Sequence, residues 1–332
     1  MKAAVVGSGA WGTALALRLY ENGHAVTLWS HSAESAQKIY AERCNPRLPG
    51  VVLPEKMSIS ADHACVADCD LVVIACPSFP LRSVCRAVAP YLKTDTVLAC
   101  ATKGIEDGTL LRMSQVVHQE TGRQVVVLTG PSHAEEVAGE IPTGCVSACD
   151  NKALAEFVQD AFMSENFRIY TSADPIGAEI GGALKNVIAL CAGVTDGLGY
   201  GDNTKAMLMT RGLTEIARLG VSLGASKDTF AGLAGVGDLI VTCTSRHSRN
   251  RRAGILIGQG RTPREAMKEV GAVVEGYYAA KSAWALCQKQ CVEMPILHAA
   301  YAVLYENENA AQVVKTLLHR CKKAESEDVG WI

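Results

Sequence analysis

The sequence predicts an α/β protein with an N-terminal doubly wound sheet and an all-α C-terminal domain. Three observations support this fold class. A buried strand, a glycine-rich turn and a helix open the chain. Short apolar runs and helical patterns then alternate up to about residue 174, as in a mostly parallel sheet covered by helices. Beyond that point only helical spacing recurs.

The opening turn carries a G-x-G-x-x-G spacing. Residues 3–6 indicate a buried strand, Gly7, Gly9 and Gly12 follow, and residues 13–20 show a helical pattern. Gly7 permits a tight turn, Gly9 lets the backbone approach a pyrophosphate, and Gly12 allows close helix–strand packing. The pyrophosphate would lie on free N–H groups at the helix N-terminus. An ordinary glycine turn shares this spacing, but the flanking elements favour a Rossmann-like site for a nicotinamide or flavin dinucleotide.

The second strand, residues 25–29, ends without the acidic residue that is typical of an NAD-selective site. Ser30, His31 and Ser32 stand there, and the first acid is Glu34. No carboxylate would bind the ribose 2′-hydroxyl or repel a 2′-phosphate, so NADP(H) should be accepted. His31 is either a partner of that phosphate or a solvent-exposed loop residue. We expect NADP(H) as the favoured cofactor and NAD(H) as a second one.

The remaining elements follow from apolar runs and from 3.6-residue spacing. In the first half we expect helices over 34–43 and 81–89, a Pro/Gly-rich loop over 44–54, and strands over 71–76, 96–100, 125–128, 144–148 and 167–170. In the second half we expect helices over 176–191, 204–223, 254–257, 263–270, 277–291 and 310–322, and a frayed tail over 325–328. Pro175 suits the first turn of a helix. It marks the boundary between predicted domains 1–174 and 175–332.

Length and composition fit a globular protein and argue against several classes. The 332 residues are 48% hydrophobic and 20% charged, which suits two domains with separate cores. A formal net charge of -2 argues against a general nucleic-acid binder. We see no apolar run near the roughly 18 residues of a membrane span, and no secretion signal. The 13 cysteines, scattered through predicted strands and helices, indicate free buried thiols in the cytoplasm. We expect no metal site, because no histidine cluster accompanies the C-x-x-x-C pairs.

Two polar segments follow central strands, where ligands bind in a doubly wound sheet. Lys103 lies directly after the strand over 96–100, and its alternative is a solvated surface lysine. Gly130 and Ser132 follow the next strand. Ser132 with Glu135 forms either a capping box or a hydroxyl and free N–H groups that hold substrate.

The helical half contributes a lysine and a basic cluster. Lys185 lies in an otherwise apolar helix, where a charge is costly unless it is paired or used. It either extends to solvent or, with a lowered proton affinity, serves in acid–base chemistry. Asp238 precedes residues 242–252, where arginines and a histidine mix with Ser, Thr and Asn. Guanidinium groups and hydroxyls satisfy phosphate oxygens, which favours a small phosphorylated ligand over a basic surface patch or a nuclear-localisation-like run.

In this order, the motifs resemble those of bacterial-type NAD(P)-dependent glycerol-3-phosphate dehydrogenases over essentially the whole chain. The matching segments are 7–16, 101–104, 130–132, 184–187, 237–239 with 248–250, and 273–277. A small departure is the exchange of Ser8 and Ala10 relative to the commoner family order, which leaves the glycine turn intact. The resemblance implies reversible reduction of dihydroxyacetone phosphate to sn-glycerol 3-phosphate with NADPH or NADH, for phospholipid synthesis.

The resemblance also implies residue roles. Lys185 would give a proton to the developing alkoxide, Asp238 would orient it, and Lys103 would add positive charge near the carbonyl oxygen. Besides Gly7, Gly9 and Gly12, the cofactor-binding residues would be Ala10, Trp11, His31, Lys103, Ala134, Arg249, Val273 and Glu275. The substrate-binding residues would be Lys103, Gly130, Ser132, Lys185, Asp238, Ser248, Arg249 and Asn250, the last three holding the phosphate at a helix start.

Two other classes stay open from the sequence. One is a two-domain dehydrogenase of the 6-phosphogluconate or 3-hydroxyacyl type, which a substrate panel would separate. The other is a non-catalytic NADP-sensing protein, against which stand both lysines, Asp238 and the Ser-Arg-Asn triplet. By analogy with apolar helical domains that pair, we expect a homodimer.

Overall fold

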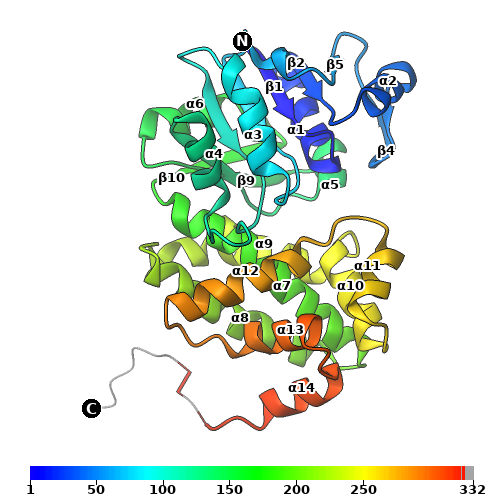
Figure 1. The fold of residues 1–332 in the computed structure, drawn as a ribbon, viewed down its shortest axis with the longest axis vertical. Coiled ribbons are helices and arrows are strands. Elements are labelled where there is room, and N and C mark those ends of the chain that lie inside the picture. The colour runs from blue at the N-terminus through cyan, green and yellow to red at the C-terminus, as the bar shows by residue number, and fades with distance from the viewer. Residues whose placement is uncertain (323, 326–332) are drawn as a thin grey trace.

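The computed structural model describes residues 1–322, 324 and 325, so most of the predicted tail over 325–328 lies outside the described residues. The strands lie within residues 2–172, and a helical body follows from residue 175 (Figure 1). This confirms the predicted class: a Rossmann-like sheet domain and an all-α region after it.

Eight strands form the main sheet, in the order β10-β9-β8-β7-β6-β1-β2-β5. Their bounds are β1 Lys2–Val6, β2 Ala25–Trp29, β5 Ser58–Ser60, β6 Leu71–Ile74, β7 Val97–Cys100, β8 Val125–Thr129, β9 Thr143–Ala148 and β10 Phe167–Ser172. The strands from β5 to β8 are parallel, whereas β9 runs antiparallel to β8 and β10 follows β9. The carboxyl ends of β1, β6, β7 and β8 therefore share one edge, and the chain reverses its strand order between β1 and β6, where ligands bind in such sheets.

Helices cover both faces of this sheet: α1 Ala10–Glu21, α2 Ala33–Glu42, α3 Leu81–Val88, α4 Met113–Thr121, α5 Ala134–Ala138 and α6 Lys152–Phe162. Successive residues of a strand point to opposite faces. Val5 packs in one core with Leu15 of α1, and Val6 packs in another with Leu81 of α3. Burial on both faces explains why the central strands are continuously apolar.

The helical body is built around α7 (Pro175–Gly197), as Figure 1 shows. Around it lie α8 Asp202–Ser222, α9 Asp238–Thr244, α10 Arg249–Gly258, α11 Pro263–Val270, α12 Glu275–Lys289, α13 Pro295–Tyr305 and α14 Ala310–Leu318. Pro175 occupies the first turn as predicted, and the Asp174 carboxylate accepts from the N–H of Gly177 at 2.9 Å.

We expected no apolar run of membrane-spanning length, but α7 has the length and composition of one. Among the described residues it is the single helix that is long and apolar enough to cross a membrane. The surrounding protein buries 89% of its apolar 18-residue stretch. Its apolar character therefore has an explanation inside the fold, as the core of the helical body.

Glycines let the backbones of α7 and α10 touch. A Cβ added at Gly193 would lie 2.0 Å from the carbonyl oxygen of Arg251, and one at Gly254 would lie 2.0 Å from that of Leu190. No side chain fits at either place. The start of α10 is consequently fixed against α7.

Several elements differ from the prediction. The expected loop over 44–54 contains a two-stranded hairpin, β3 Cys44–Asn45 and β4 Leu48–Val52. We did not predict β5, α4, α5, α6, α9 or α13, and the helix predicted over 254–257 is only the second half of α10. All 13 cysteines are free, as expected, but Cys291 and Cys321 are exposed rather than buried.

Candidate active site

A buried carboxylate held between two lysines forms the centre of the candidate site. Asp238, which has no exposed surface, bonds the Lys185 ammonium through Oδ1. Its Oδ2 accepts from Lys103 Nζ at 2.7 Å, and Lys185 Nζ also donates to Thr242 Oγ1 at 2.7 Å. Lys103 comes from the loop after β7, Lys185 from α7, and Asp238 from the start of α9. The three predicted catalytic residues thus meet where the sheet edge and the helical body join.

Two glycines before Lys185 allow this meeting. A Cβ at Gly182 would lie 2.8 Å from Thr129 Oγ1 at the end of β8, and 3.7 Å from Lys103 Cδ. A Cβ at Gly181 would lie 2.3 Å from the carbonyl oxygen of Ala234, just before α9. Without side chains at these positions, α7 can bring Lys185 against the strand ends and against α9 together.

The surroundings make Lys185 a weak base. Burial disfavours its ammonium form, Asp238 opposes this effect, and the positive charge of Lys103 adds to it; together they lower the pKa of Lys185 to about 7. The side chains of Lys185 and Lys103 are only 8% and 18% exposed, which contradicts the alternative of solvated lysines. A lysine with this pKa can give or take a proton near neutral pH.

The glycine turn fits a dinucleotide. Gly7 has φ +130°, and a Cβ there would lie 2.7 Å from the carbonyl carbon of Ala75 after β6. A Cβ at Gly12 would lie 1.9 Å from the carbonyl oxygen of Gly7, whereas around Gly9 nothing lies within 4 Å. No side chain caps the first turn of α1, and the buried indole N–H of Trp11 has no partner among the described residues. The turn therefore has open space and unpaired donors for a pyrophosphate.

A buried serine stands at the end of β2, where an NAD-selective site typically has an acidic residue. Ser30 has no exposed surface, and its Oγ accepts from Ser8 Oγ at 2.8 Å. Asn45 donates to the carbonyl oxygen of Ser8 at 3.0 Å and braces the turn. His31 is exposed beside it. The arrangement places no carboxylate here and leaves an imidazole free to meet a phosphate.

Glu275, predicted to bind the cofactor, links the helical body to the sheet edge. Its carboxylate accepts from the Oγ of Ser78 at 2.7 Å and from the N–H of Ser78 at 3.3 Å, and burial raises its pKa. Ser78 follows β6, beside the glycine turn. Val273 lies half-buried two residues before Glu275, and Ala134 is buried at the start of α5. Glu275 thus lies at the sheet edge, and the cofactor contacts of all three residues stay predictions.

In the Ser-Arg-Asn triplet, two side chains form hydrogen bonds within the protein and the third does not. Ser248 Oγ accepts from the N–H of Arg251 at 3.2 Å and so caps α10. Asn250 donates to Asn186 Oδ1 at 2.9 Å and accepts from the N–H of Gly276 at 2.9 Å. Arg249 is exposed and has no hydrogen bond or ion pair with any described residue. Arg249 is therefore the member available for a phosphate, while Asn250 ties the start of α10 to α7 and α12.

Gly130 and Ser132 lie beside the lysines, as predicted. The carbonyl oxygen of Gly130 accepts from Lys103 Nζ at 3.3 Å and from Ser132 Oγ at 3.0 Å. Helix α5 begins after His133 without a side-chain cap, so the capping-box interpretation of Ser132 was wrong. The Ser132 hydroxyl instead donates to the carbonyl oxygen that Lys103 also bonds.

Two residues that the sequence did not single out contribute to the site. Thr242 lies four residues after Asp238, one helical turn away, and this spacing could have indicated a shared face. His133 is half-buried, and burial together with the charge of Lys185 lowers its pKa. No local signal separates His133 from an ordinary loop histidine.

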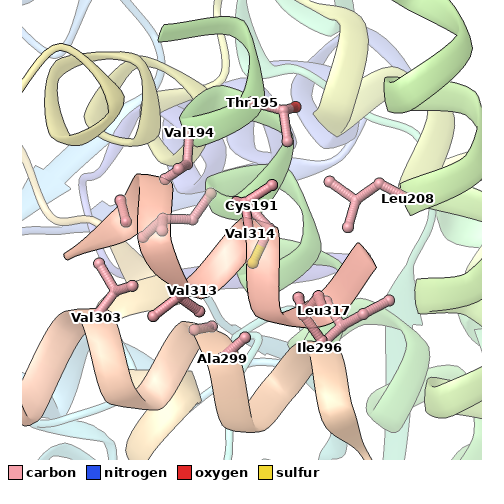
Figure 2. Close-up of a pocket in the computed structure, with 13 residues that line it drawn as sticks. Cys191, Val194, Thr195, Leu208, Ile296, Ala299, Val303, Val313, Val314 and Leu317 are labelled. Carbon is pink, nitrogen blue, oxygen red and sulfur yellow. The ribbon is translucent and has the colours of Figure 1, made fainter. Parts of the chain in front are cut away.

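A small, partly open apolar pocket of the helical body lies apart from these residues. About 50 Å³ in volume, it lies between α7, α8, α13 and α14, and Figure 2 shows the Cys191 sulfur and several aliphatic side chains around it. Thr195 is the one residue of its lining with a side-chain hydroxyl. A phosphorylated ligand finds no charge partner there. Across the described residues, no group of three or more His, Cys, Asp and Glu side chains is placed to hold a metal ion.

Comparison with known proteins gives one consistent result. Residues 2–155 match the profile of the N-terminal part of NAD-dependent glycerol-3-phosphate dehydrogenase, and residues 174–315 match that of its C-terminal part. A glycerol-3-phosphate dehydrogenase (NAD(P)+) of Fusobacterium nucleatum is 51% identical over 330 residues, 98% of each chain. One of Thermoanaerobacter sp. is 51% identical over 326 residues, 98% of this chain and 99% of its own. The crystal structure of the Coxiella burnetii enzyme superposes with a TM-score of 0.93 at 38% identity, covering 96% of this chain and 99% of that one.

Proposed function

Because the chain belongs to the NAD-dependent glycerol-3-phosphate dehydrogenase family, we propose that the Lys185–Asp238–Lys103 cluster is where it reduces dihydroxyacetone phosphate. The chain is an oxidoreductase that uses NAD(H) or NADP(H) and interconverts dihydroxyacetone phosphate and sn-glycerol 3-phosphate. The observation that carries the site assignment is the buried carboxylate between two lysines, at the sheet edge that also bears the glycine turn.

The glycine turn and its neighbours would hold the cofactor. Gly7, Gly9 and Gly12 leave room for the pyrophosphate, and the N–H groups of Ala10 and Trp11 face it from the uncapped first turn of α1. His31 would meet the adenosine end. When bound, the dinucleotide supplies the hydride that adds to the substrate carbonyl carbon.

Lys185 would supply the proton in reduction and accept it in oxidation. Its Nζ is held by Asp238 and Thr242, which fix its direction without covering its third hydrogen. Lys103 would stabilise negative charge on the carbonyl oxygen, because its ammonium lies in the same low-dielectric site. The lowered pKa of Lys185 favours proton transfer at neutral pH.

The start of α10 would bind the substrate phosphate. Arg249 has a free guanidinium fork, and the helix N-terminus adds N–H donors. Ser248 would contribute its hydroxyl hydrogen, and Ser132 would donate to the substrate from the other side. Asn250 would act through the loop that it anchors.

The wider setting is also part of the proposal. We take residues 1–174 as the dinucleotide-binding domain and 175–332 as the substrate domain, in a cytoplasmic homodimer that spans no membrane and binds no nucleic acid. The burial of α7 and the net charge of -2 support the last two points. Glycerol 3-phosphate from this reaction would supply phospholipid synthesis.

NADPH oxidation followed by absorbance in the presence of dihydroxyacetone phosphate tests the function directly. We expect turnover that depends on both substrates, and a large loss in Lys185→Met. If purified, folded protein binds NADPH but oxidises none with dihydroxyacetone phosphate, the proposal is wrong.

A further inference from the structure

We call residues 248–250, the N-cap and first two residues of α10, the phosphate loop. A second ion cluster contacts the next residue, Arg251. Asp196, near the end of α7, accepts from Arg251 Nε at 2.7 Å and lies 2.7 Å from its Nη2, both through Oδ2. The other oxygen, Oδ1, lies 2.8 Å from Lys205 Nζ of α8. The three side chains are 15–20% exposed. We call Asp196, Lys205 and Arg251 the support cluster.

The support cluster connects directly to the loop that carries the phosphate-binding candidates. The backbone N–H of Arg251 donates to Ser248 Oγ, while its guanidinium is held by Asp196. The carbonyl oxygen of Arg251 faces Gly193 of α7, where no side chain would fit. Arg251 is therefore held by hydrogen bonds at its side chain and its backbone N–H, and its carbonyl oxygen lies against α7. Movement of Asp196 would be transmitted to Ser248 and to the first turn of α10.

The same helix carries the acid–base residue. Lys185 and Asp196 both lie on α7, about three turns apart along a continuous helix. Asn186, next to Lys185, bonds Asn250 of the phosphate loop. The loop is thus attached to α7 near Lys185 through Asn250 and farther along through Arg251. Two attachments on one rigid helix fix the distance and the tilt of the loop relative to the Lys185 ammonium.

The charges favour a dianion. Two cations share one partly buried carboxylate, so the support cluster carries a net positive charge next to residues that already present Arg249. Asp202, which lies 3.8 Å from Lys205, is fully exposed and screened by water. Partly buried charges are screened far less, so the excess charge acts toward the loop.

We propose that Asp196 is a positioning residue for the substrate phosphate, acting through Arg251, with Lys205 fixing its second oxygen. The cluster holds the phosphate loop in place relative to Lys185, because both are attached to α7. This inference rests on the proposed assignment of Ser248–Asn250 to the phosphate.

Asp196→Asn tests the inference, because it removes the charge and keeps the shape. We expect the KM for dihydroxyacetone phosphate to rise by about 10-fold or more, since a misplaced loop weakens phosphate binding. The inhibition constant of inorganic phosphate against this substrate should rise by a similar factor. The kcat should change by less than about 3-fold, and the KM for NADPH should stay the same. Asp196→Glu, which keeps the charge, should recover most of the loss.

Asp202→Asn is the matched control. It removes a carboxylate beside the same lysine at an exposed position, so both KM values should match the wild type. If Asp196→Asn fails to fold, Arg251→Lys replaces it: the charge stays but the fork to Asp196 is lost, and the same rise in KM is expected.

Arg249→Ala separates this inference from the proposed function. If Arg249→Ala raises the KM for dihydroxyacetone phosphate while Asp196→Asn and Arg251→Lys leave it unchanged, the support cluster has no positioning role. If Arg249→Ala also leaves it unchanged, the loop does not bind phosphate and the underlying proposal is wrong. Equal losses in kcat and in NADPH binding in folded Asp196→Asn would indicate a general structural role and would overturn the inference.

Discussion

Replacing Lys185 separates its chemical role from its structural one. Lys185→Met removes the ammonium but keeps an unbranched side chain in α7. Proton transfer by a positioned group contributes about 10²–10⁴-fold, so kcat should fall by that factor, or roughly 3–5 kcal/mol of transition-state stabilisation. The glycine turn lies on β1 and α1, away from this change. NADPH affinity should therefore change by less than about 3-fold.

The contacts of Asp238 also determine how much folding stability Lys185→Met should lose. Asp238 is wholly buried, and breaking a buried pair costs about 3–5 kcal/mol when the remaining charge has no partner. Here Lys103 Nζ stays 2.7 Å from the same carboxylate, and the substitution removes a lysine that burial already disfavours as a cation. We therefore expect a smaller loss, about 1–3 kcal/mol.

Lys185→Arg serves as the control for charge. An arginine keeps a cation beside Asp238 but cannot release its proton in a protein, since its pKa exceeds about 12. Turnover in both variants, NADPH binding by fluorescence, and the free energy of unfolding in urea are the measurements. A wild-type kcat in Lys185→Arg would refute the acid–base role, because charge alone would then be enough. A loss of kcat in Lys185→Met that only matches its loss of NADPH binding would refute it as well.

Four further predictions follow from the same geometry. Reduction needs Lys185 as an ammonium, so kcat/KM for dihydroxyacetone phosphate should fall as the pH rises above about 7. Oxidation needs neutral Lys185, so kcat/KM for glycerol 3-phosphate should rise through about pH 7 to a plateau. Parallel pH profiles in the two directions would contradict this role. Arg249→Ala should raise the KM for dihydroxyacetone phosphate by about 10–100-fold, matching a lost charged hydrogen bond of about 1.5–3 kcal/mol, and an unchanged KM would mean that the guanidinium only meets solvent. Ser30→Asp should shift the cofactor preference toward NADH by about 10-fold, because its carboxylate would repel the 2′-phosphate of NADPH. Some folding stability should be lost, because Ser30 is buried against Ser8. The preference is measured with both cofactors in competition, and an unchanged NADPH-to-NADH ratio would refute the role of this position in cofactor choice. Gly254→Ala should destabilise the helical body by at least about 2 kcal/mol in urea unfolding, because its Cβ would lie 2.0 Å from a backbone oxygen of α7, and near-neutral stability would show that α10 can shift.

The parts of the site that could be predicted are those fixed by local spacing. The glycine turn needs its three glycines at set intervals beside one strand and one helix, and the structure shows that Gly7 and Gly12 have no room for a side chain. Lys185 stood out because a charge in an apolar helix needs a partner. Its partner Asp238 was suggested by the family resemblance, not by the spacing of 53 residues between them.

The parts that could not be predicted depend on tertiary contacts. The bond of Glu275 to Ser78 joins residues 197 positions apart, and that of Asn250 to Asn186 joins residues 64 apart. Helical spacing in α9 is brief, since the helix has only 7 residues, and so Thr242 was seen as one hydroxyl in a basic segment. The antiparallel direction of β9 likewise cannot be recognised from its six residues, because direction depends on which strand lies beside it.

The ion pair at the centre of the site is also a joint between two bodies. Lys103 belongs to the sheet and Asp238 to the helices, and Glu275 and Ser78 cross the same boundary nearby. Heat that separates the two bodies would break this pair while each body still keeps its own core. Thermal inactivation should then precede the loss of helical content, and saturating NADPH should raise the inactivation temperature more than it raises the melting of either core. We therefore expect the thermal stability of the activity to depend on the contacts between the two bodies rather than on the core of either one.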